Sequence, residues 1–280
     1  MAPDSIAAAL LAARRRLALT SDTAALDARL LLQAAVNVSH EDIIAEPDRR
    51  LSAEELAQFE AFVTRRLANE PVSRILGGRD FYGRSFWLTP DVLDPRPDTE
   101  TLIDAALARI KPRSRLLDLG TGSGIIAVTL LAECPDTTGL ATDLSSAALA
   151  VARSNAERHG VLSRLELRQG SWFEPVSGSF DLIFSNPPYI PAGEIPGLAP
   201  DVRDFDPPAA LSGGPDGLEA YRAIARHAAA HLNPHGHVLV EIGAGQADAV
   251  SALFAAAGFV NAERFQDLGG HDRCLSLRLG

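Results

Sequence analysis

The sequence predicts an α/β fold with a doubly wound, mostly parallel sheet of seven strands, preceded by a small helical domain and a β-hairpin linker. After residue 111, short apolar runs of strand length alternate with segments of helix length, the pattern of a parallel sheet with helices on both faces. Before residue 72, apolar residues recur at helical spacing instead. We therefore expect a helical domain over 1–72, a hairpin linker over 73–97 and the sheet domain over 98–280.

The expected helical domain contains several helix-start signals. Asp4 or Ser5 is placed to cap a first helix, the segment 21–22 a second, and Ser52 with Glu55 forms a capping box that begins another. Apolar residues follow each signal at helical spacing. Apolar residues at this spacing usually form the hydrophobic core of their own domain, so no cofactor site is expected here.

The linker has a different texture, rich in glycine, aromatic and turn residues. The segment 81–88 predicts a hairpin. The motif P-R-P-D-T-E at 95–100 then begins a helix, with Asp98 placed as its cap. By itself this motif indicates nothing more than a helix start.

The sheet domain follows from the alternation of strand and helix patterns. Helices are expected at 124–132, 145–159, 218–232 and 247–257. Strands are expected at 115–119, 138–142, 165–168, 180–184, 237–242, 262–265 and 274–279.

Composition excludes several classes of protein. The net charge of −10 over 280 residues argues against a surface that follows nucleic-acid phosphates non-specifically. Cys134 and Cys274 lie far apart in apolar segments, so reduced, buried thiols are expected. The four histidines between 227 and 237 have no interleaved acidic or thiolate residue, so no metal site is expected. Without a basic leader or a membrane-length apolar run, the protein is expected in the cytoplasm, with no membrane partner.

The stretch 116–125 predicts a strand that runs into a glycine turn and a helix, an arrangement that binds nucleotides. The spacing is G-x-G-x-G, and Ile125 stands where a dinucleotide fingerprint needs its last glycine. Asp143 ends the next strand, where a carboxylate accepts hydrogen bonds from ribose hydroxyls. A nucleoside without a pyrophosphate, S-adenosylmethionine, fits this pattern, while an ordinary strand–turn–helix is the alternative. The expected cofactor-binding residues here are Gly120, Thr121, Gly122, Ser123, Gly124 and Asp143.

A second motif follows the strand expected at 180–184. It consists of Asn186, Pro187, Pro188 and Tyr189. The prolines fix their own backbone angles and restrict the residues before them, so the turn should be stiff. The Asn186 side-chain oxygen and a backbone carbonyl then offer two acceptors to a planar –NH2 group, and the Tyr189 ring offers a stacking face. A proline-rich strand exit without chemical consequence is the alternative.

Taken together, the motifs resemble those of the class I S-adenosylmethionine-dependent methyltransferases. More narrowly, the chain is similar to the HemK-type protein-(glutamine-N5) methyltransferases, which modify peptide-chain release factors. The resemblance covers nearly the whole chain, through the segments 70–72, 81–83, 95–100, 118–124, 186–189 and 212–218. The chain departs from the family pattern at Arg74, Asp94 and Ser171, the last of which puts one adenine contact in doubt.

The resemblance implies methyl transfer from S-adenosylmethionine to the glutamine N5 in the Gly-Gly-Gln motif of class 1 release factors. It adds Trp172 and Asn186 to the cofactor-binding residues, and it implies a catalytic role for Asn186, Pro187 and Tyr189. Asn186, Pro187, Pro188 and Tyr189 would also bind the substrate. The helical domain would dock the release factor, and no nucleic-acid substrate is implied.

Two other substrates share parts of this pattern. A glutamine methyltransferase acting on a large-subunit ribosomal protein has the same motifs. A DNA amino-methyltransferase has the tetrad, but the net charge of −10 and the lack of a basic target-recognition domain argue against it. A non-catalytic binding module of this fold would lack an intact tetrad.

Overall fold

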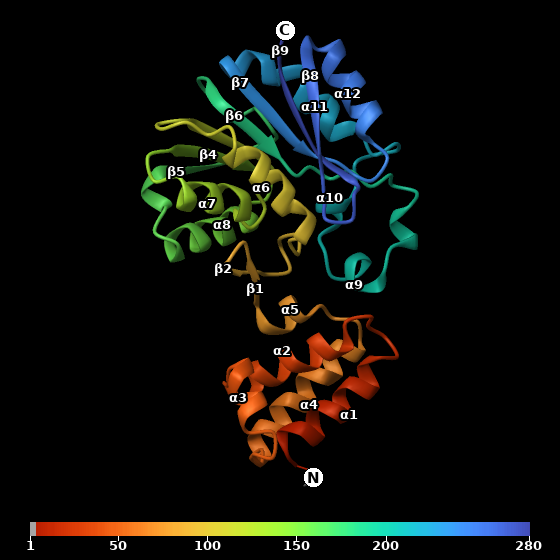
Figure 1. Ribbon diagram of the computed structural model, residues 1–280. Helices are drawn as coiled ribbons and strands as arrows, with labels where there is room; N and C mark the ends of the chain where they lie inside the picture. The colour runs from red at the N-terminus through yellow and green to blue at the C-terminus, as the bar shows by residue number, and fades with distance from the viewer. Residues whose placement is uncertain (1–3) are drawn as a thin grey trace. The chain divides into compact units, whose positions relative to one another are not determined.

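In the computed structural model, which describes residues 4–280, the chain divides into two units (Figure 1). The first, called the helical unit below, contains residues 4–78 together with Pro200–Phe205. The second, the sheet unit, contains Arg79–Ala199 and Asp206–Gly280. The expected three-part division at 72 and 97 stays a prediction.

The helical unit is built around one apolar core. Its helices are α1 (Ile6–Leu17), α2 (Ala24–Val36), α3 (His40–Ala45), α4 (Ala53–Leu67), α5 (Val72–Leu76) and the short α9 (Pro200–Arg203). Leu17, Leu31 and Phe59 are fully buried in this core. A buried ion pair, Arg66 Nε to Asp27 Oδ2 at 2.8 Å, joins α4 to α2.

Two of the predicted helix starts in this unit are confirmed and one is wrong. Ser5 caps α1, and Ser52 begins α4 through a complete capping box with Glu55. The predicted cap at 21–22 is wrong, because α2 begins after Thr23 and has no side-chain cap. The hydroxyls of Ser21 and Thr23 instead donate to the Asp27 carboxylate at 2.7 and 2.9 Å, so the buried ion pair takes the groups that would have capped the helix.

The sheet unit contains the predicted doubly wound, mostly parallel sheet. Its strands are β3 (Arg115–Leu119), β4 (Thr138–Asp143), β5 (Leu165–Gln169), β6 (Phe180–Ser185), β7 (Leu232–Glu241), β8 (Phe259–Gln266) and β9 (Asp272–Leu279). Their order is β5-β4-β3-β6-β7-β9-β8, and β9 alone runs antiparallel to its neighbours (Figure 1). The sheet is therefore mixed, with the reversed strand next to one edge.

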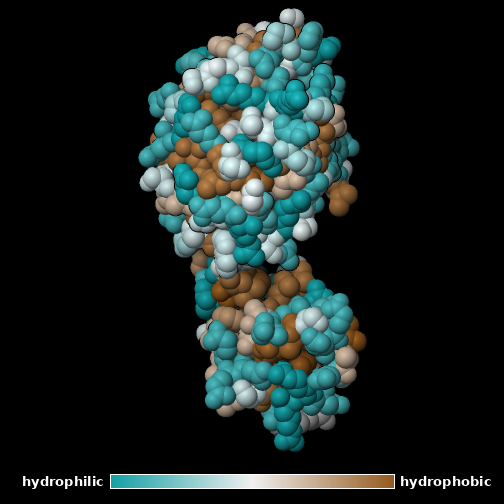
Figure 2. All heavy atoms as spheres, turned by 90° about the vertical axis from the view of Figure 1, so that its left-hand side faces the viewer, coloured by the Kyte–Doolittle hydropathy of each residue, from teal (hydrophilic) through white to brown (hydrophobic). Residues whose placement is uncertain are grey.

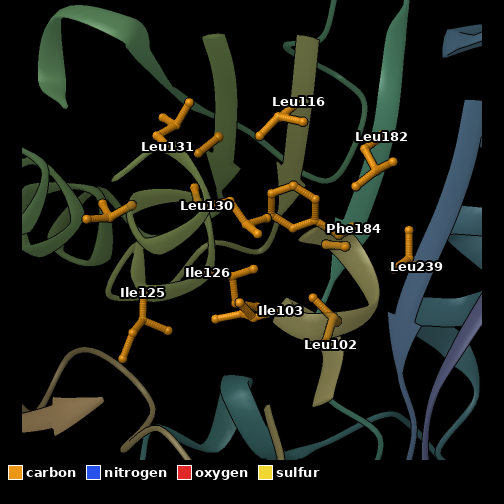
Figure 3. Close-up of a cluster of buried hydrophobic side chains, with 14 of the residues drawn as sticks. Leu102, Ile103, Leu116, Ile125, Ile126, Leu130, Leu131, Leu182, Phe184 and Leu239 are labelled. Atoms are coloured by element: carbon orange, nitrogen blue, oxygen red, sulfur yellow. The ribbon is translucent and has the colours of Figure 1, made fainter. Parts of the chain in front are cut away.

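Helices cover both faces of this sheet. The principal ones are α6 (Glu100–Leu107), α7 (Ile125–Glu133), α8 (Ser146–Arg158), α11 (Glu219–Ala228) and α12 (Ala247–Ala256), and α10 (Pro208–Leu211) is a single turn. On one face, Ile103 of α6 and Leu130 of α7 point toward Leu116 and Phe184 of the sheet (Figure 3). On the other face, α11 and α12 bury a second core against alternate residues of the same strands.

Three details of this unit differ from the expectations. Strand β7 begins at Leu232, five residues before the predicted start. Leu232 already pairs with Phe180 of β6, and the register of the two strands shifts before His237 pairs with Leu182. Asp98 does not cap the helix after the 95–100 motif, since its carboxylate pairs with Arg273 at 3.1 Å. Cys134 is only half-buried, whereas Cys274 is buried as expected, and both are free thiols.

The predicted hairpin is present as β1 (Gly78–Phe81) and β2 (Arg84–Trp87). Tyr82 and Gly83 make the turn between them with positive φ angles of 48° and 70°. Phe81 and Phe86 meet edge to face, with ring centroids 6.5 Å apart, and join the core under α6 and α7. Phe81 and Phe86 of the linker are therefore core residues of the sheet unit, whereas Trp87 is exposed.

The surface is mostly polar. In the view of Figure 2, hydrophilic side chains cover much of each unit, and hydrophobic side chains show in patches on both. Four large hydrophobic residues are exposed on the helical unit, namely Leu11, Leu19, Leu26 and Ile44. Within residues 4–280, every helix is too short or too polar to cross a bilayer.

Candidate active site

Four strands bring the candidate residues to one edge of the sheet. The carboxyl ends of β4, β3, β6 and β7 lie side by side and carry Asp143, the glycine loop, Asn186 and Glu241. The chain order reverses between β3 and β6, which is where open α/β sheets form a ligand crevice. Ser185 ties these two ends together, because its hydroxyl donates to the Leu119 carbonyl at 2.6 Å.

The glycine loop between β3 and α7 has the backbone that a bound nucleoside needs. Gly122 has a φ of 55°, and a methyl group added there would meet nothing within 4 Å, so the loop presents open backbone at this point. Gly124 has a packing role, since a methyl group there would lie 3.0 Å from Ala152 Cβ. Asn155 supports the loop by donating from Nδ2 to the Ser123 carbonyl at 2.8 Å.

Asp143 lies beside this loop and shapes it. Its carboxylate accepts the Gly122 N–H at 2.8 Å and the Ser145 N–H at 2.9 Å. Each carboxylate oxygen keeps a further lone pair for a ligand hydroxyl. Asp143 thus lies at the end of β4, as the sequence predicts, and its carboxylate also holds the backbone of the glycine loop.

Asp118 is a buried carboxyl group under the same loop. Thr121 donates its hydroxyl to Asp118 Oδ2 at 2.6 Å, while Oδ1 has no hydrogen-bond partner among residues 4–280. Burial raises the pKa of this carboxyl to about 7. An acidic residue inside an otherwise apolar strand was the sequence signal for it.

Trp172 reaches the loop from the segment after β5. A methyl group added to Gly120 would lie 3.6 Å from the indole Cζ3 atom, so the ring and the loop are in contact distance. Thr142 donates to the Trp172 carbonyl at 3.1 Å and fixes this turn to β4. The predicted cofactor-binding residues Gly120, Thr121, Gly122, Ser123, Gly124, Asp143 and Trp172 are therefore gathered around one loop.

The tetrad follows β6 directly, next to the glycine loop. Asn186 donates from Nδ2 to Thr99 Oγ1 at 3.2 Å, which leaves its Oδ1 as the free acceptor of the side chain. Among the described residues, no hydrogen bond reaches the carbonyl of Pro187, a buried residue. Two acceptor oxygens, one from a side chain and one from the backbone, are thus available at adjacent positions.

The tetrad backbone is held from the other side by the segment 211–218. The Ile190 N–H donates to the Leu211 carbonyl at 3.1 Å, and the Gly213 N–H donates to the Ile190 carbonyl at 2.9 Å. Gln246 completes the support by donating from Nε2 to the Tyr189 carbonyl at 2.9 Å. The family-like segment 212–218 therefore fixes the tetrad, and Gln246 is a support that the sequence did not reveal.

The Tyr189 ring is mostly buried and packs beside Gly243. A methyl group added to Gly243 would lie 3.0 Å from Tyr189 Cδ2, so only glycine fits this contact comfortably. Burial is the main reason that the pKa of the Tyr189 hydroxyl rises to about 12. The side chain is neutral near pH 7, as a stacking ring requires.

Glu241, which the sequence analysis did not single out, lies at the end of β7 beside Asn186. It is 2% exposed, and its Oε2 has no hydrogen-bond partner among residues 4–280. Burial raises the pKa of the carboxyl to about 7, while hydrogen bonding with Thr99 and Asn186 lowers it. A lone acidic residue after the apolar run 238–240 was the available signal.

The 95–100 motif is more than a helix start, because its polar side chains each contact a distant part of the sheet unit. The contacts are Arg96 with Asp206 at 3.2 Å, Asp98 with Arg273 at 3.1 Å, Thr99 with Asn186 at 3.2 Å, and Glu100 with the Tyr82 N–H at 3.2 Å. The motif therefore connects the hairpin, β9 and the tetrad.

Comparison with known proteins identifies the family. Residues 8–77 match the PrmC N-terminal domain, and residues 96–196 match the methyltransferase small domain. The release factor glutamine methyltransferase of Cereibacter sphaeroides is 54% identical over 272 residues, which are 97% of this chain and 97% of that protein. This chain belongs to the release factor glutamine methyltransferase family.

A second member of the release factor glutamine methyltransferase family, from Agrobacterium fabrum, is 44% identical over 281 residues, 98% of this chain and 97% of that protein. Among solved structures, the ribosomal protein L11 methylase from Lactobacillus delbrueckii has a TM-score of 0.51 at 24% identity, covering 67% of this chain and 82% of that one. The family resemblance and the class I methyltransferase fold that the sequence predicts are both confirmed.

Proposed function

We propose that the protein transfers a methyl group from S-adenosylmethionine to the side-chain amide nitrogen, N5, of the glutamine in the Gly-Gly-Gln motif of class 1 peptide-chain release factors (EC class 2.1.1). The observation that carries this proposal is the pair of free acceptors, Asn186 Oδ1 and the Pro187 carbonyl, beside the glycine loop. Two acceptors at fixed positions match the two N–H groups of a primary amide. We place the reaction in the cytoplasm, where release factors act.

The residues around the glycine loop fit S-adenosylmethionine. Open backbone at Gly122 and the adjacent Asp143 carboxylate suit the ribose, and the Trp172 indole, which lies against Gly120, would pack against the adenine ring. The loop lacks the last glycine of the fingerprint that binds a dinucleotide pyrophosphate, because Ile125 stands at that position. When bound, the cofactor supplies an electrophilic methyl group on a sulfonium.

The chain's own residues orient the amide. An amide nitrogen is a poor nucleophile, because its lone pair is delocalised into the carbonyl. Asn186 Oδ1 and the Pro187 carbonyl each accept one N–H, so the remaining electron density of the nitrogen points toward the glycine-loop side of the site. Tyr189 stacks on the amide plane and keeps it from rotating. The new N–CH3 bond replaces the S–CH3 bond, and one N–H proton leaves to water or to an acceptor oxygen.

The helical unit is proposed as the docking surface for the release factor. A single flexible glutamine offers too little binding energy for selection, so a remote surface must supply the rest. Leu11, Leu19, Leu26 and Ile44 are exposed on this unit, and exposed hydrophobic residues are typical of interaction surfaces.

Labelled S-adenosylmethionine tests the substrate. It is supplied with purified release factor, ribosomal proteins and duplex oligonucleotide side by side, and the label is mapped by mass spectrometry. We expect label on the Gly-Gly-Gln glutamine, and none when that glutamine is replaced by alanine. Label only on a ribosomal protein or on DNA would refute the proposal in favour of one of the two alternatives.

Substitutions on the helical unit test docking. L19S and I44S should raise KM for the intact release factor while kcat stays unchanged. Both side chains are exposed, and in the sequence they lie far from the glycine loop and the tetrad. L268S is the matched control, since Leu268 is fully exposed on the sheet unit. Equal KM values for all variants would remove the docking role from these residues.

A further inference from the structure

We propose that Gln246 is a positioning residue that sets the direction of the Tyr189 ring toward the substrate amide. This inference rests on the proposed function and deepens it, because it says what aims the stacking ring. Gln246 stands directly before α12, and it lies outside the motifs that the sequence analysis singled out. It acts through Tyr189 and does not need to touch the substrate.

The Gln246 side chain bridges two backbone groups. Its Nε2 donates to the Tyr189 carbonyl at 2.9 Å, and its Oε1 accepts the Gly243 N–H at 3.0 Å. A backbone carbonyl only accepts and a backbone N–H only donates, so these partners fix which way the Gln246 amide faces. The amide cannot turn over without losing both hydrogen bonds.

Gly243 also lies against the Tyr189 ring. A methyl group added to Gly243 would lie 3.0 Å from Tyr189 Cδ2 and 2.9 Å from Gln246 Oε1. The ring therefore packs on the same residue to which Gln246 connects the Tyr189 carbonyl. Because one amide holds both, the ring can shift along Gly243 only if a hydrogen bond of Gln246 breaks.

The peptide group between Tyr189 and Ile190 has hydrogen bonds at both of its ends. Gln246 holds the carbonyl, and the Ile190 N–H donates to the Leu211 carbonyl at 3.1 Å. A peptide group is planar, so two bonds at opposite ends fix its plane, and the ring of Pro188 restricts the chain on the other side of Tyr189. Without Gln246 the plane is held at one end only, and the direction of the tyrosine side chain is less well defined.

Two glycines enclose the hydrogen bond between Gln246 and Tyr189. A methyl group added to Gly217 would overlap the Tyr189 carbonyl oxygen and lie 2.9 Å from Gln246 Nε2. Gly217 and Gly243 are both buried, so the bond is shielded from water on two sides, and its loss is costly. The family-like segment 212–218 thus contributes the glycine that leaves room for this bond.

The loop that carries Gln246 is itself fixed. The Gln246 N–H donates to the Gly243 carbonyl at 3.1 Å, and the Val250 N–H donates to the Gln246 carbonyl at 2.9 Å. The end of β7 just before this loop is held by Tyr221, whose hydroxyl donates to the Glu241 carbonyl at 2.9 Å. The Gln246 amide is therefore anchored on both the sheet and α12, and it can hold the ring in place.

Q246E tests the bond to Tyr189 selectively. The carboxylate still accepts the Gly243 N–H, but an acceptor replaces the donor that faces the Tyr189 carbonyl. We expect kcat/KM for the release factor to fall by about tenfold, the loss for one buried hydrogen bond. The cofactor Kd, measured by calorimetry, should change by less than about twofold, because the glycine loop and Asp143 follow other strands.

Two further variants complete the set. Q246M has no donor and adds no charge, so it should show a similar loss, and it decides the matter if thermal unfolding shows that Q246E does not fold. Q266E is the matched control, because Gln266 also donates from its Nε2, to Asp272 at 3.2 Å, but is exposed. It makes the same substitution on the same unit and should leave kcat/KM unchanged.

A double-mutant cycle separates positioning from a purely structural tether. In a Y189A background there is no ring to aim, so adding Q246E should cause no further loss of kcat/KM. In a Y189F background the ring is present, so the same addition should cause the full loss of about tenfold. A structural tether would cause equal losses in both, since the backbone carbonyl at position 189 remains in each.

Two results would overturn the inference: wild-type kcat/KM in Q246E and Q246M, or the same fractional loss on adding either of them to Y189A and to Y189F. A failure of the proposed function is distinguishable from these, since the wild-type protein would then not methylate the release factor at all.

Discussion

Replacing Asp143 by alanine removes one carboxylate that serves two partners. On the protein side, it accepts the Gly122 N–H at 2.8 Å and the Ser145 N–H at 2.9 Å. On the ligand side, we assign its remaining lone pairs to the ribose hydroxyls of S-adenosylmethionine. D143A should therefore weaken cofactor binding and also loosen the glycine loop of the free protein.

The two losses differ in size. A hydrogen bond to a charged acceptor contributes roughly 1–3 kcal/mol, so losing the ribose contact should raise the cofactor Kd by about 5- to 150-fold. The two backbone N–H groups are only partly buried, and water replaces the carboxylate there. The free energy of unfolding of the free protein should accordingly fall by only about 1 kcal/mol.

Calorimetry with S-adenosylmethionine measures the first loss and urea unfolding the second. D136A is the matched control, because Asp136 is an exposed carboxylate in the turn that leads into the amino end of the same strand. D143N separates the contributions, since its amide oxygen still accepts one loop N–H. Wild-type affinity in D143A, or an equal loss in D136A, would remove Asp143 from the cofactor site.

Further predictions concern the tetrad, the buried carboxyl of Asp118 and the buried ion pair of the helical unit. N186A should lower kcat by about a hundredfold or more, with a much smaller change in cofactor affinity. Tyr189→Phe should change kcat by less than about threefold, because the ring and not the hydroxyl stacks on the substrate amide. Steady-state kinetics measure kcat, and calorimetry measures the cofactor affinity. The folded-state pKa of Asp118 is raised to about 7, so its contribution to stability is present at low pH and is lost as the pH rises toward 7. Urea unfolding of D118N should therefore lack a fall on the order of 4 kcal/mol that wild type shows between about pH 4 and 7. D27A leaves Arg66 buried without its partner. Urea unfolding should show that the free energy of unfolding of the helical unit falls by about 3–5 kcal/mol. A loss below about 1 kcal/mol would show that the ion pair is not buried in solution.

Local signals in the sequence were sufficient for most of the fold. The apolar run at 180–184 predicted β6, because a strand buried on both faces needs no polar alternation. The capping box at Ser52 predicted the start of α4, since its two hydrogen bonds join residues three positions apart. The glycine spacing predicted the loop after β3, because positive φ angles restrict the residue type at each position.

Predictions failed where a tertiary contact competed for a local group. Asp98 was expected to cap a helix, but Arg273 takes its carboxylate, and Asp27 takes the hydroxyls near the start of α2. The early start of β7 depends on pairing with β6 across a register shift, which no local pattern around Pro234 indicates. Arg273 and β6 are remote in the chain from the groups that they contact. Asp27 is only four and six residues from the two hydroxyls, but its carboxylate pairs with Arg66, which is 39 residues away.

The sequence by itself determined which residues stand at the carboxyl edge of the sheet, because strand ends, glycine turns and proline restrictions are properties of neighbouring residues. Only the tertiary structure decided how Asn186 is oriented. Its Nδ2 donates to Thr99 Oγ1, and Thr99 is 87 residues away in the chain. Hydrogen bonds of this kind join groups that approach only after the sheet has formed, and burial then makes their loss costly.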